Sequence, residues 1–216
     1  MERQEIIQST AAFVAGEFAS EGSGHDWFHI DRVRRIALRI GKTEGGDLFI
    51  IEMAALLHDL DDYKITGLES PVPEKAKSWL SSQNVEADVA SLILQVIEEV
   101  SYKGSGIETP VSSVESAVVQ DADRLDAIGA IGIARTFAYG GHKNRLIHDP
   151  KIAPEMHDDF QSYKNSTAPT INHFYEKLLL LKDRMNTNTA KLMAAQRHQF
   201  MENYLQHFFD EWEAQV

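Results

Sequence analysis

Cysteine is absent from the 216 residues of the chain. Its absence excludes disulfide bonds, zinc sites built from thiolates and catalysis by a cysteine nucleophile. A chain without disulfides is typical of a reducing compartment, so we expect a cytoplasmic protein. Residues 1–5 also lack the charged-then-apolar layout of a signal peptide, which agrees with that expectation.

Long apolar runs and basic residues are scarce as well. No stretch of about 18 apolar residues occurs, so no membrane span is expected. The 21 lysines and arginines are outnumbered by 33 aspartates and glutamates, which gives a net charge of -12. This balance argues against binding a nucleic-acid polymer or an anionic membrane, because both need basic patches. The P-loop, the dinucleotide fingerprint and the Gly-x-Ser-x-Gly elbow are also missing.

Apolar residues recur at helical spacing along most of the chain. The pattern predicts helices over residues 3–20, 26–42, 47–60, 73–80, 86–101, 111–127, 127–138, 169–186 and 188–212. No segment is convincing as a strand, and residues 139–168 are the least regular part, as in many substrate loops. We therefore predict an all-α protein with a single domain over residues 1–216. Its core would span about 24–138, with the helices of 169–212 packed on it.

The helix predicted at 47–60 is apolar on nearly every face, which indicates a central, buried helix. It runs into the sequence His58-Asp59-Leu60-Asp61-Asp62. A His-Asp dipeptide occurs four times in the chain, but only His58-Asp59 ends a buried helix. A buried polar group without a partner costs about 2–7 kcal/mol. His58 and Asp59 must therefore find partners elsewhere in the chain.

Two distant residues are candidates for those partners. His29 ends the core-facing stripe of the preceding helix, and the short Gly-rich connection favours antiparallel packing of the two helices. Asp123 lies among apolar positions of a later helix and needs a partner too. With His58 and Asp59 they form a set of two imidazoles and two carboxylates. Such a set suits a divalent ion with positions open for water and substrate; the alternative is a buried hydrogen-bond network without metal.

The order His29, His58-Asp59, Asp123 resembles the H…HD…D signature of the HD-domain superfamily of metal-dependent phosphohydrolases. The resemblance covers the whole chain. Within the superfamily, the sequence is most similar to the small bacterial YedJ/YpgQ-like branch. The segments that carry this further likeness are residues 101–104, 121–129 and 174–178. The resemblance implies a single HD-domain helical bundle.

The resemblance also implies the composition of the metal site. The sequence Ala-Asp-Arg-Leu at 122–125 matches the family pattern that places Asp123 as the last ligand, with Asp121 and Asp126 as alternatives. Multi-metal HD proteins have additional histidines before this aspartate, and this chain has none between His58 and Asp123. One divalent ion is therefore implied, Mn²⁺ or Mg²⁺ in preference to Fe²⁺, Co²⁺, Ni²⁺ or Zn²⁺.

Roles in catalysis follow from the same resemblance. Small HD nucleotidases have an acidic residue three positions after the HD aspartate that acts as general acid or base, which is Asp62 here, whereas Asp61 is expected to be a solvated carboxylate. A metal ion balanced by two carboxylates is roughly neutral, so bound phosphates need further cations. Lys64, Lys103 and Arg124 are candidates because they lie near the motifs, although each is equally well explained as a surface charge or an ion-pair partner.

The expected activity is hydrolysis of a phosphate ester or anhydride in a small nucleotide. Within the branch, release of pyrophosphate from a nucleoside triphosphate is the favoured reaction. The alternatives are a nucleoside monophosphate phosphatase and a non-catalytic nucleotide sensor. The partner is then a small phosphorylated molecule, and the protein is expected to be a monomer or a homodimer.

Overall fold

The computed structural model describes residues 2–19, 26–61, 73–100, 109, 111–156 and 167–216, and most of these are helical. In chain order the helices are α1 (Arg3–Glu17), α2 (Trp27–Glu44), α3 (Leu48–Leu57), α5 (Glu74–Ser82), α6 (Ala87–Val100), α7 (Val114–Asp126), α8 (Gly129–His142), α10 (Asn172–Glu176), the 3₁₀ helix η1 (Leu178–Arg184) and α11 (Asn188–Trp212). None of the described residues lies in a strand, which confirms the all-α prediction.

The contacts fall into two units that divide between residues 123 and 124 of α7. The first unit holds α1, α2, α3, α5, α6 and most of α7, and the second holds α8, α10, η1 and α11. The single domain expected over the whole chain stays a prediction. Every helix in the described parts of the chain is too short or too polar to cross a lipid bilayer.

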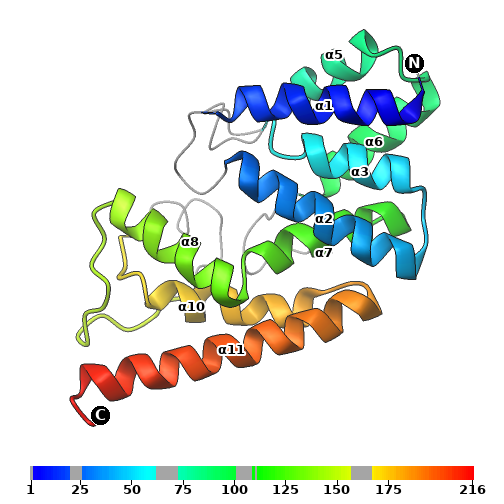
Figure 1. Ribbon diagram of the computed structural model, residues 1–216. Coiled ribbons are helices and arrows are strands. Elements are labelled where there is room, and N and C mark those ends of the chain that lie inside the picture. The colour runs from blue at the N-terminus through cyan, green and yellow to red at the C-terminus, as the bar shows by residue number, and fades with distance from the viewer. Residues whose placement is uncertain (1, 20–25, 62–72, 101–108, 110, 157–166) are drawn as a thin grey trace. The chain divides into compact units, whose positions relative to one another are not determined.

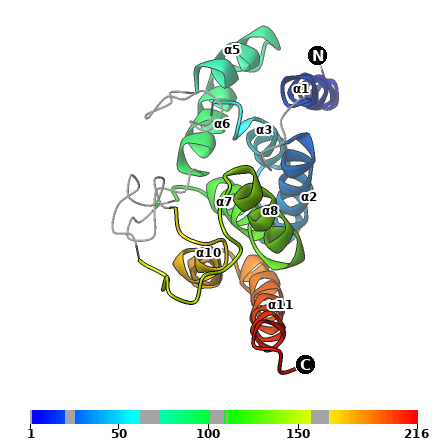
Figure 2. The same cartoon turned by 90° about the vertical axis from the view of Figure 1, so that its left-hand side faces the viewer.

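Helix α3 lies at the centre of the first unit, where it packs against α1, α2 and α6 (Figures 1 and 2). Glu52 is its one charged residue. Its buried side chains are Phe49, Ile50, Ile51, Met53, Ala54, Ala55, Leu56 and Leu57. Burying each large aliphatic side chain contributes about 1.5–3 kcal/mol. The central helix predicted from its uniform hydrophobicity is therefore confirmed.

Helix α2 presents one apolar face to α3, and its start and end follow from local chemistry. Asp26 is the N-cap, and its side chain accepts a hydrogen bond from the His29 amide at 2.8 Å. Gly45 and Gly46 have φ angles of 98° and 94° and turn the chain into α3. Gly41 allows close packing, since a Cβ there would lie 2.8 Å from Ile51 Cδ1.

An ion pair fixes the register of α2 against α3. Arg34 Nε donates to Glu52 Oε1 at 2.7 Å, and the Glu52 side chain is 12% exposed. Arg34, whose side chain is 26% exposed, thus lies partly between the two helices. A charge-assisted hydrogen bond of this kind is stronger than a neutral one.

The second unit is built on α11, which packs against α8 and η1 (Figure 1). The single helix predicted over 169–186 is wrong in detail. It is interrupted at Lys177, whose φ of -144° and ψ of -58° are not helical. The irregular region also begins later than residue 139, because α8 continues through Gly140 and Gly141. Gly140 is used for close packing, since a Cβ there would overlap the Thr170 side chain.

Glu115 connects the start of α7 to the start of α3 within the first unit. Its Oε1 accepts a hydrogen bond from the Asp47 amide at 2.9 Å, and Asp47 in turn caps α3 by accepting from the Phe49 amide. Burial by itself would raise the pKa of Glu115. The hydrogen bonds from the Asp47 amide and from Ser113 outweigh burial, so the pKa lies below its usual value of 4.5.

We expect Glu115→Gln to lower the free energy of unfolding at pH 7 by about 1 kcal/mol, because a neutral acceptor holds the Asp47 amide less strongly. A carboxyl with a lowered folded-state pKa stabilises the protein above its unfolded-state pKa, and this contribution is lost as the pH falls through the folded-state value. The deficit should therefore disappear in acid. Urea unfolding from pH 7 to about pH 3 measures it, with Glu98→Gln on the exposed face of α6 as control. A deficit that is the same at both ends of the range would contradict this assignment.

Candidate metal centre

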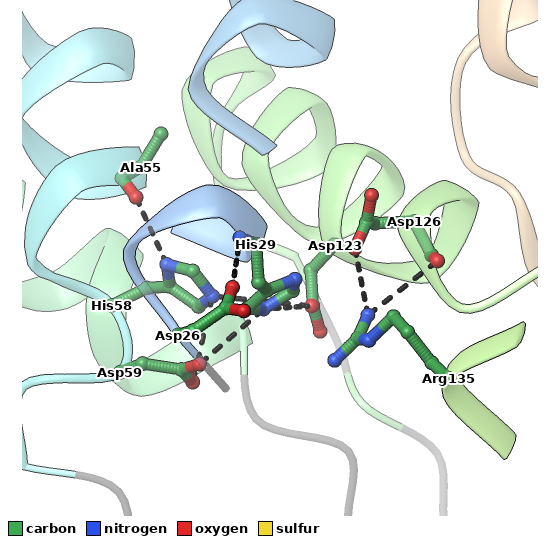
Figure 3. A network of polar contacts seen from close by, with 8 residues as sticks. All are labelled: Asp26, His29, Ala55, His58, Asp59, Asp123, Asp126 and Arg135. Carbon is green, nitrogen blue, oxygen red and sulfur yellow. Dashed lines mark hydrogen bonds and ion pairs between the residues drawn. The ribbon is translucent and has the colours of Figure 1, made fainter. Parts of the chain in front are cut away.

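Four side chains converge at the C-terminal end of α3 (Figure 3). His29 comes from the first turn of α2, His58 and Asp59 from the end of α3, and Asp123 from α7. His29 Nε2 lies 3.3 Å from Asp59 Oδ2 and 3.5 Å from Asp123 Oδ1. His58 Nε2 lies 3.5 Å from Asp59 Oδ1 and 3.9 Å from Asp123 Oδ1. Helices α2, α3 and α7 therefore bring together the four residues predicted as ligands.

The His58 ring is oriented by its own helix. Its Nδ1 lies 2.9 Å from the Ala55 carbonyl oxygen. A carbonyl oxygen can only accept, so Nδ1 carries a proton, and in the neutral ring Nε2 keeps its lone pair. That Nε2 is buried and makes no hydrogen bond with any residue the structure describes. An imidazole whose second nitrogen donates to a backbone carbonyl is the usual arrangement of a metal-ligating histidine.

The cluster is buried on the histidine side and more open at Asp123. His29, His58 and Asp59 are 1%, 7% and 6% exposed, whereas the Asp123 side chain is 29% exposed. One donor atom each from His29, His58 and Asp59 lies within 4.8 Å of the other two, a spacing suited to binding a single ion. The carboxylates of Asp59 and Asp123 lie 3.3 and 3.5 Å from the same atom, His29 Nε2, and carboxylates this close repel each other unless a proton or a cation lies between them. The donor set therefore fits a divalent cation.

Neighbouring aspartates on α7 have other surroundings. Asp126 is 1% exposed and accepts from Arg135 Nη1 at 2.7 Å, as Figure 3 shows. Asp121 is fully buried. Of the three aspartates considered for the last ligand position, Asp123 has a carboxylate beside both histidines.

Asp61 is not a solvated carboxylate, and that expectation is wrong. Its Oδ1 accepts from the Lys75 amide at 3.2 Å and its Oδ2 from the Ala76 amide at 3.1 Å. Both amides belong to the first turn of α5, where they have no partner within their own helix. The side chain is held by a helix that begins 13 residues further along the chain, so local sequence gave no sign of it.

The remaining predicted site residues are Asp62, Lys64, Lys103 and Arg124. Asp62, Lys64 and Lys103 lie outside the described residues. Arg124 is 6% exposed and its Nη1 donates to the Arg184 carbonyl. This contact gives its guanidinium a structural use, and its role in substrate binding stays a prediction. The Ala55 carbonyl was not foreseen, although a position three residues before His58 on one helix is where such a partner is expected.

Comparison with known proteins gives a consistent result. A family model described as the HD domain matches residues 27–128, which include all four clustered residues. The uncharacterised protein YpgQ of Bacillus subtilis is 37% identical over 93% of this chain and 91% of its own length. An HD-superfamily hydrolase from Bacillus thuringiensis has a crystal structure that is 46% identical, with coverage of 98% and 99% and a TM-score of 0.77. The crystal structure of Bacillus subtilis YpgQ in complex with ADP covers 95% of this chain and 97% of its own, at 35% identity and a TM-score of 0.75.

We expect Asp26→Ala to lower the free energy of unfolding by about 1 kcal/mol, the usual effect of losing an N-cap. The affected amide is that of His29, so the cap acts on the turn that carries one member of the cluster. Asp26→Ser supplies another good cap and should retain most of the stability. Urea denaturation at pH 7 measures all three proteins. Alanine and serine variants of equal stability would show that the cap has no energetic role.

Proposed function

Since the chain belongs to the HD superfamily of hydrolases, in its YpgQ-like branch, we propose that it is a divalent-metal-dependent phosphohydrolase of small nucleotides. One observation carries the proposal. His29, His58 and Asp59 form a buried cluster with donor atoms spaced for one ion, and Asp123 lies at its more exposed side. With Nδ1 donating to the Ala55 carbonyl, the buried Nε2 of His58 has its lone pair available to bind a cation.

In this proposal His29 and His58 hold the ion through Nε2, and Asp59 and Asp123 hold it through their carboxylates. Mn²⁺ and Mg²⁺ are favoured because both accept carboxylate ligands and leave positions for water and phosphate oxygens. When bound, such an ion lowers the pKa of a coordinated water and stabilises negative charge on phosphoryl oxygens. The two carboxylates balance the charge of the ion.

The ligand of a relative supports a nucleotide as the substrate. The relative YpgQ has been crystallised in complex with ADP, which is a nucleotide carrying a diphosphate. Phosphate recognition at a nearly neutral metal centre also needs further cations. Lys64, Lys103 and Arg124 remain our candidates for binding the phosphates, although the guanidinium of Arg124 already donates to the Arg184 carbonyl.

Within this class, we propose hydrolysis of a nucleoside triphosphate to the monophosphate and pyrophosphate. One water is consumed, and one phosphoanhydride bond breaks. Asp62 is our candidate for the group that accepts a proton from the attacking water or returns one to the leaving group. Asp62 follows Asp59 by three residues in the sequence.

We expect the wild-type protein with Mn²⁺ to convert at least one nucleoside triphosphate or its deoxy form into monophosphate and pyrophosphate. Ion-exchange chromatography of the products from a nucleotide panel tests this directly. Release of orthophosphate from monophosphates alone would favour a phosphatase instead. A protein that hydrolyses no nucleotide, but whose melting temperature a nucleotide raises, would be a sensor.

Asp62→Asn should keep one Mn²⁺ per chain and lose about 100-fold or more in kcat, because a positioned acid or base contributes about that factor. His58→Ala provides the contrast, since it should lose the ion itself along with turnover. Metal content by mass spectrometry and kcat from pyrophosphate release distinguish the two effects. An unchanged kcat in the Asp62 variant would remove this residue from the mechanism.

A further inference from the structure

Helix α5 receives its N-terminal cap from a distant part of the chain. Its own N-cap residue, Pro73, has no side-chain acceptor. Asp61 supplies both acceptors instead, with Oδ1 at 3.2 Å from the Lys75 amide and Oδ2 at 3.1 Å from the Ala76 amide. The positive end of the helix dipole favours a carboxylate at this position.

A cap made by a local side chain would stabilise α5 equally well by itself. A local N-cap such as Ser or Asp contributes about 1 kcal/mol. The cap at Asp61 does more than satisfy amides, because Asp61 lies two residues after Asp59 and three after His58. It joins the turn that carries two of the clustered residues to another helix.

The helix that Asp61 reaches is held firmly within the first unit. Trp79 of α5 stacks on Phe13 of α1 with ring centroids 3.9 Å apart and planes 6° apart. Trp79 Nε1 also donates to Thr10 Oγ1 at 2.9 Å, and Thr10 donates to the Ile6 carbonyl at 2.8 Å. Helix α5 further packs against α6. It can therefore resist displacement of a side chain bound at its N-terminus.

The His58–Asp59 turn is thus supported from both directions along the chain. On its upstream side it continues α3, and the Ala55 carbonyl orients His58. On its downstream side the two hydrogen bonds of Asp61 hold it to α5. Leu60 in this turn is 1% exposed, so its burial also holds the turn, and the Asp61 hydrogen bonds add the polar contact that joins the turn to α5.

We infer that Asp61 is a positioning residue of the candidate metal centre: by capping α5 it holds the turn in the conformation in which Asp59 and His58 bind the ion. The inference rests on the metal site of the proposed function. Asp61 would act through the turn, without contacting the metal or the substrate itself. Groups that orient metal ligands typically change metal affinity by about 10- to 100-fold when removed.

The test separates positioning from simple stabilisation of α5. Asp61→Ala removes the distant cap. The double variant Asp61→Ala with Pro73→Asp returns a carboxylate to the same two amides, but from within α5, so that the turn is no longer joined to the helix. Pro73→Asp alone is the matched control. For each full-length protein, calorimetric titration with Mn²⁺ alone gives Kd, and thermal unfolding gives Tm.

We expect Asp61→Ala to lower Tm and to weaken Mn²⁺ binding by about 10-fold or more. The double variant should recover most of the Tm, while its Mn²⁺ affinity stays weak. It also provides a folded protein for the titration if the single variant is unstable. Pro73→Asp alone should bind Mn²⁺ as the wild type does. Recovery of Mn²⁺ affinity together with Tm would show that Asp61 is only a helix cap, and wild-type affinity in Asp61→Ala would also overturn the inference.

Failure of the proposed function would look different. A wild-type protein that binds Mn²⁺ but hydrolyses no nucleotide would contradict the proposed reaction, and the comparison of Mn²⁺ affinities would still decide the role of Asp61. A wild-type protein that binds no Mn²⁺ would overturn both.

Discussion

The constraint on which the first unit depends is the burial of ionisable groups at one end of its most apolar helix. Placing two imidazoles and two carboxylates within a few ångströms of each other is unfavourable unless a cation or protons offset the repulsion and the lost hydration. The burial of the apolar side chains of α3 offsets this unfavourable free energy, because almost all of the residues in that helix are buried and apolar. The same helix supplies the stability and carries the two adjacent residues that need partners.

Several contacts distant from the cluster serve to keep its members in place. Arg34 and Glu52 fix the register of α2 against α3, so His29 meets the end of α3. Asp26 and Asp47 cap the starts of these helices, and Glu115 connects the second cap to α7, which provides Asp123. The contacts of Arg34 with Glu52 and of Asp47 with Glu115 join separate helices, whereas the two caps act within single helices, and each has a modest free energy. Together they define positions for donor atoms that no single helix could define.

Much of this arrangement could be predicted because it is periodic or local. The spacing of apolar residues predicted α3 as central, and antiparallel packing across a Gly-rich turn predicted His29 beside His58, whose ring centroids lie 5.5 Å apart. What could not be predicted depends on contacts between distant residues. The use of Asp61 as a cap for α5 depends on where that helix packs, and the need for glycine at position 140 depends on the close approach of Thr170. The break at Lys177 likewise has no clear sign in the apolar pattern.

The central claim is that the clustered side chains bind one divalent ion through two imidazole nitrogens and two carboxylates. Pulsed electron paramagnetic resonance of the Mn²⁺-loaded protein, prepared with ¹⁵N-labelled histidine, tests this claim most directly. We expect one tightly bound Mn²⁺ per chain and hyperfine coupling to two histidine nitrogens. Substoichiometric binding, or a bound ion without coupling to histidine nitrogen, would contradict it.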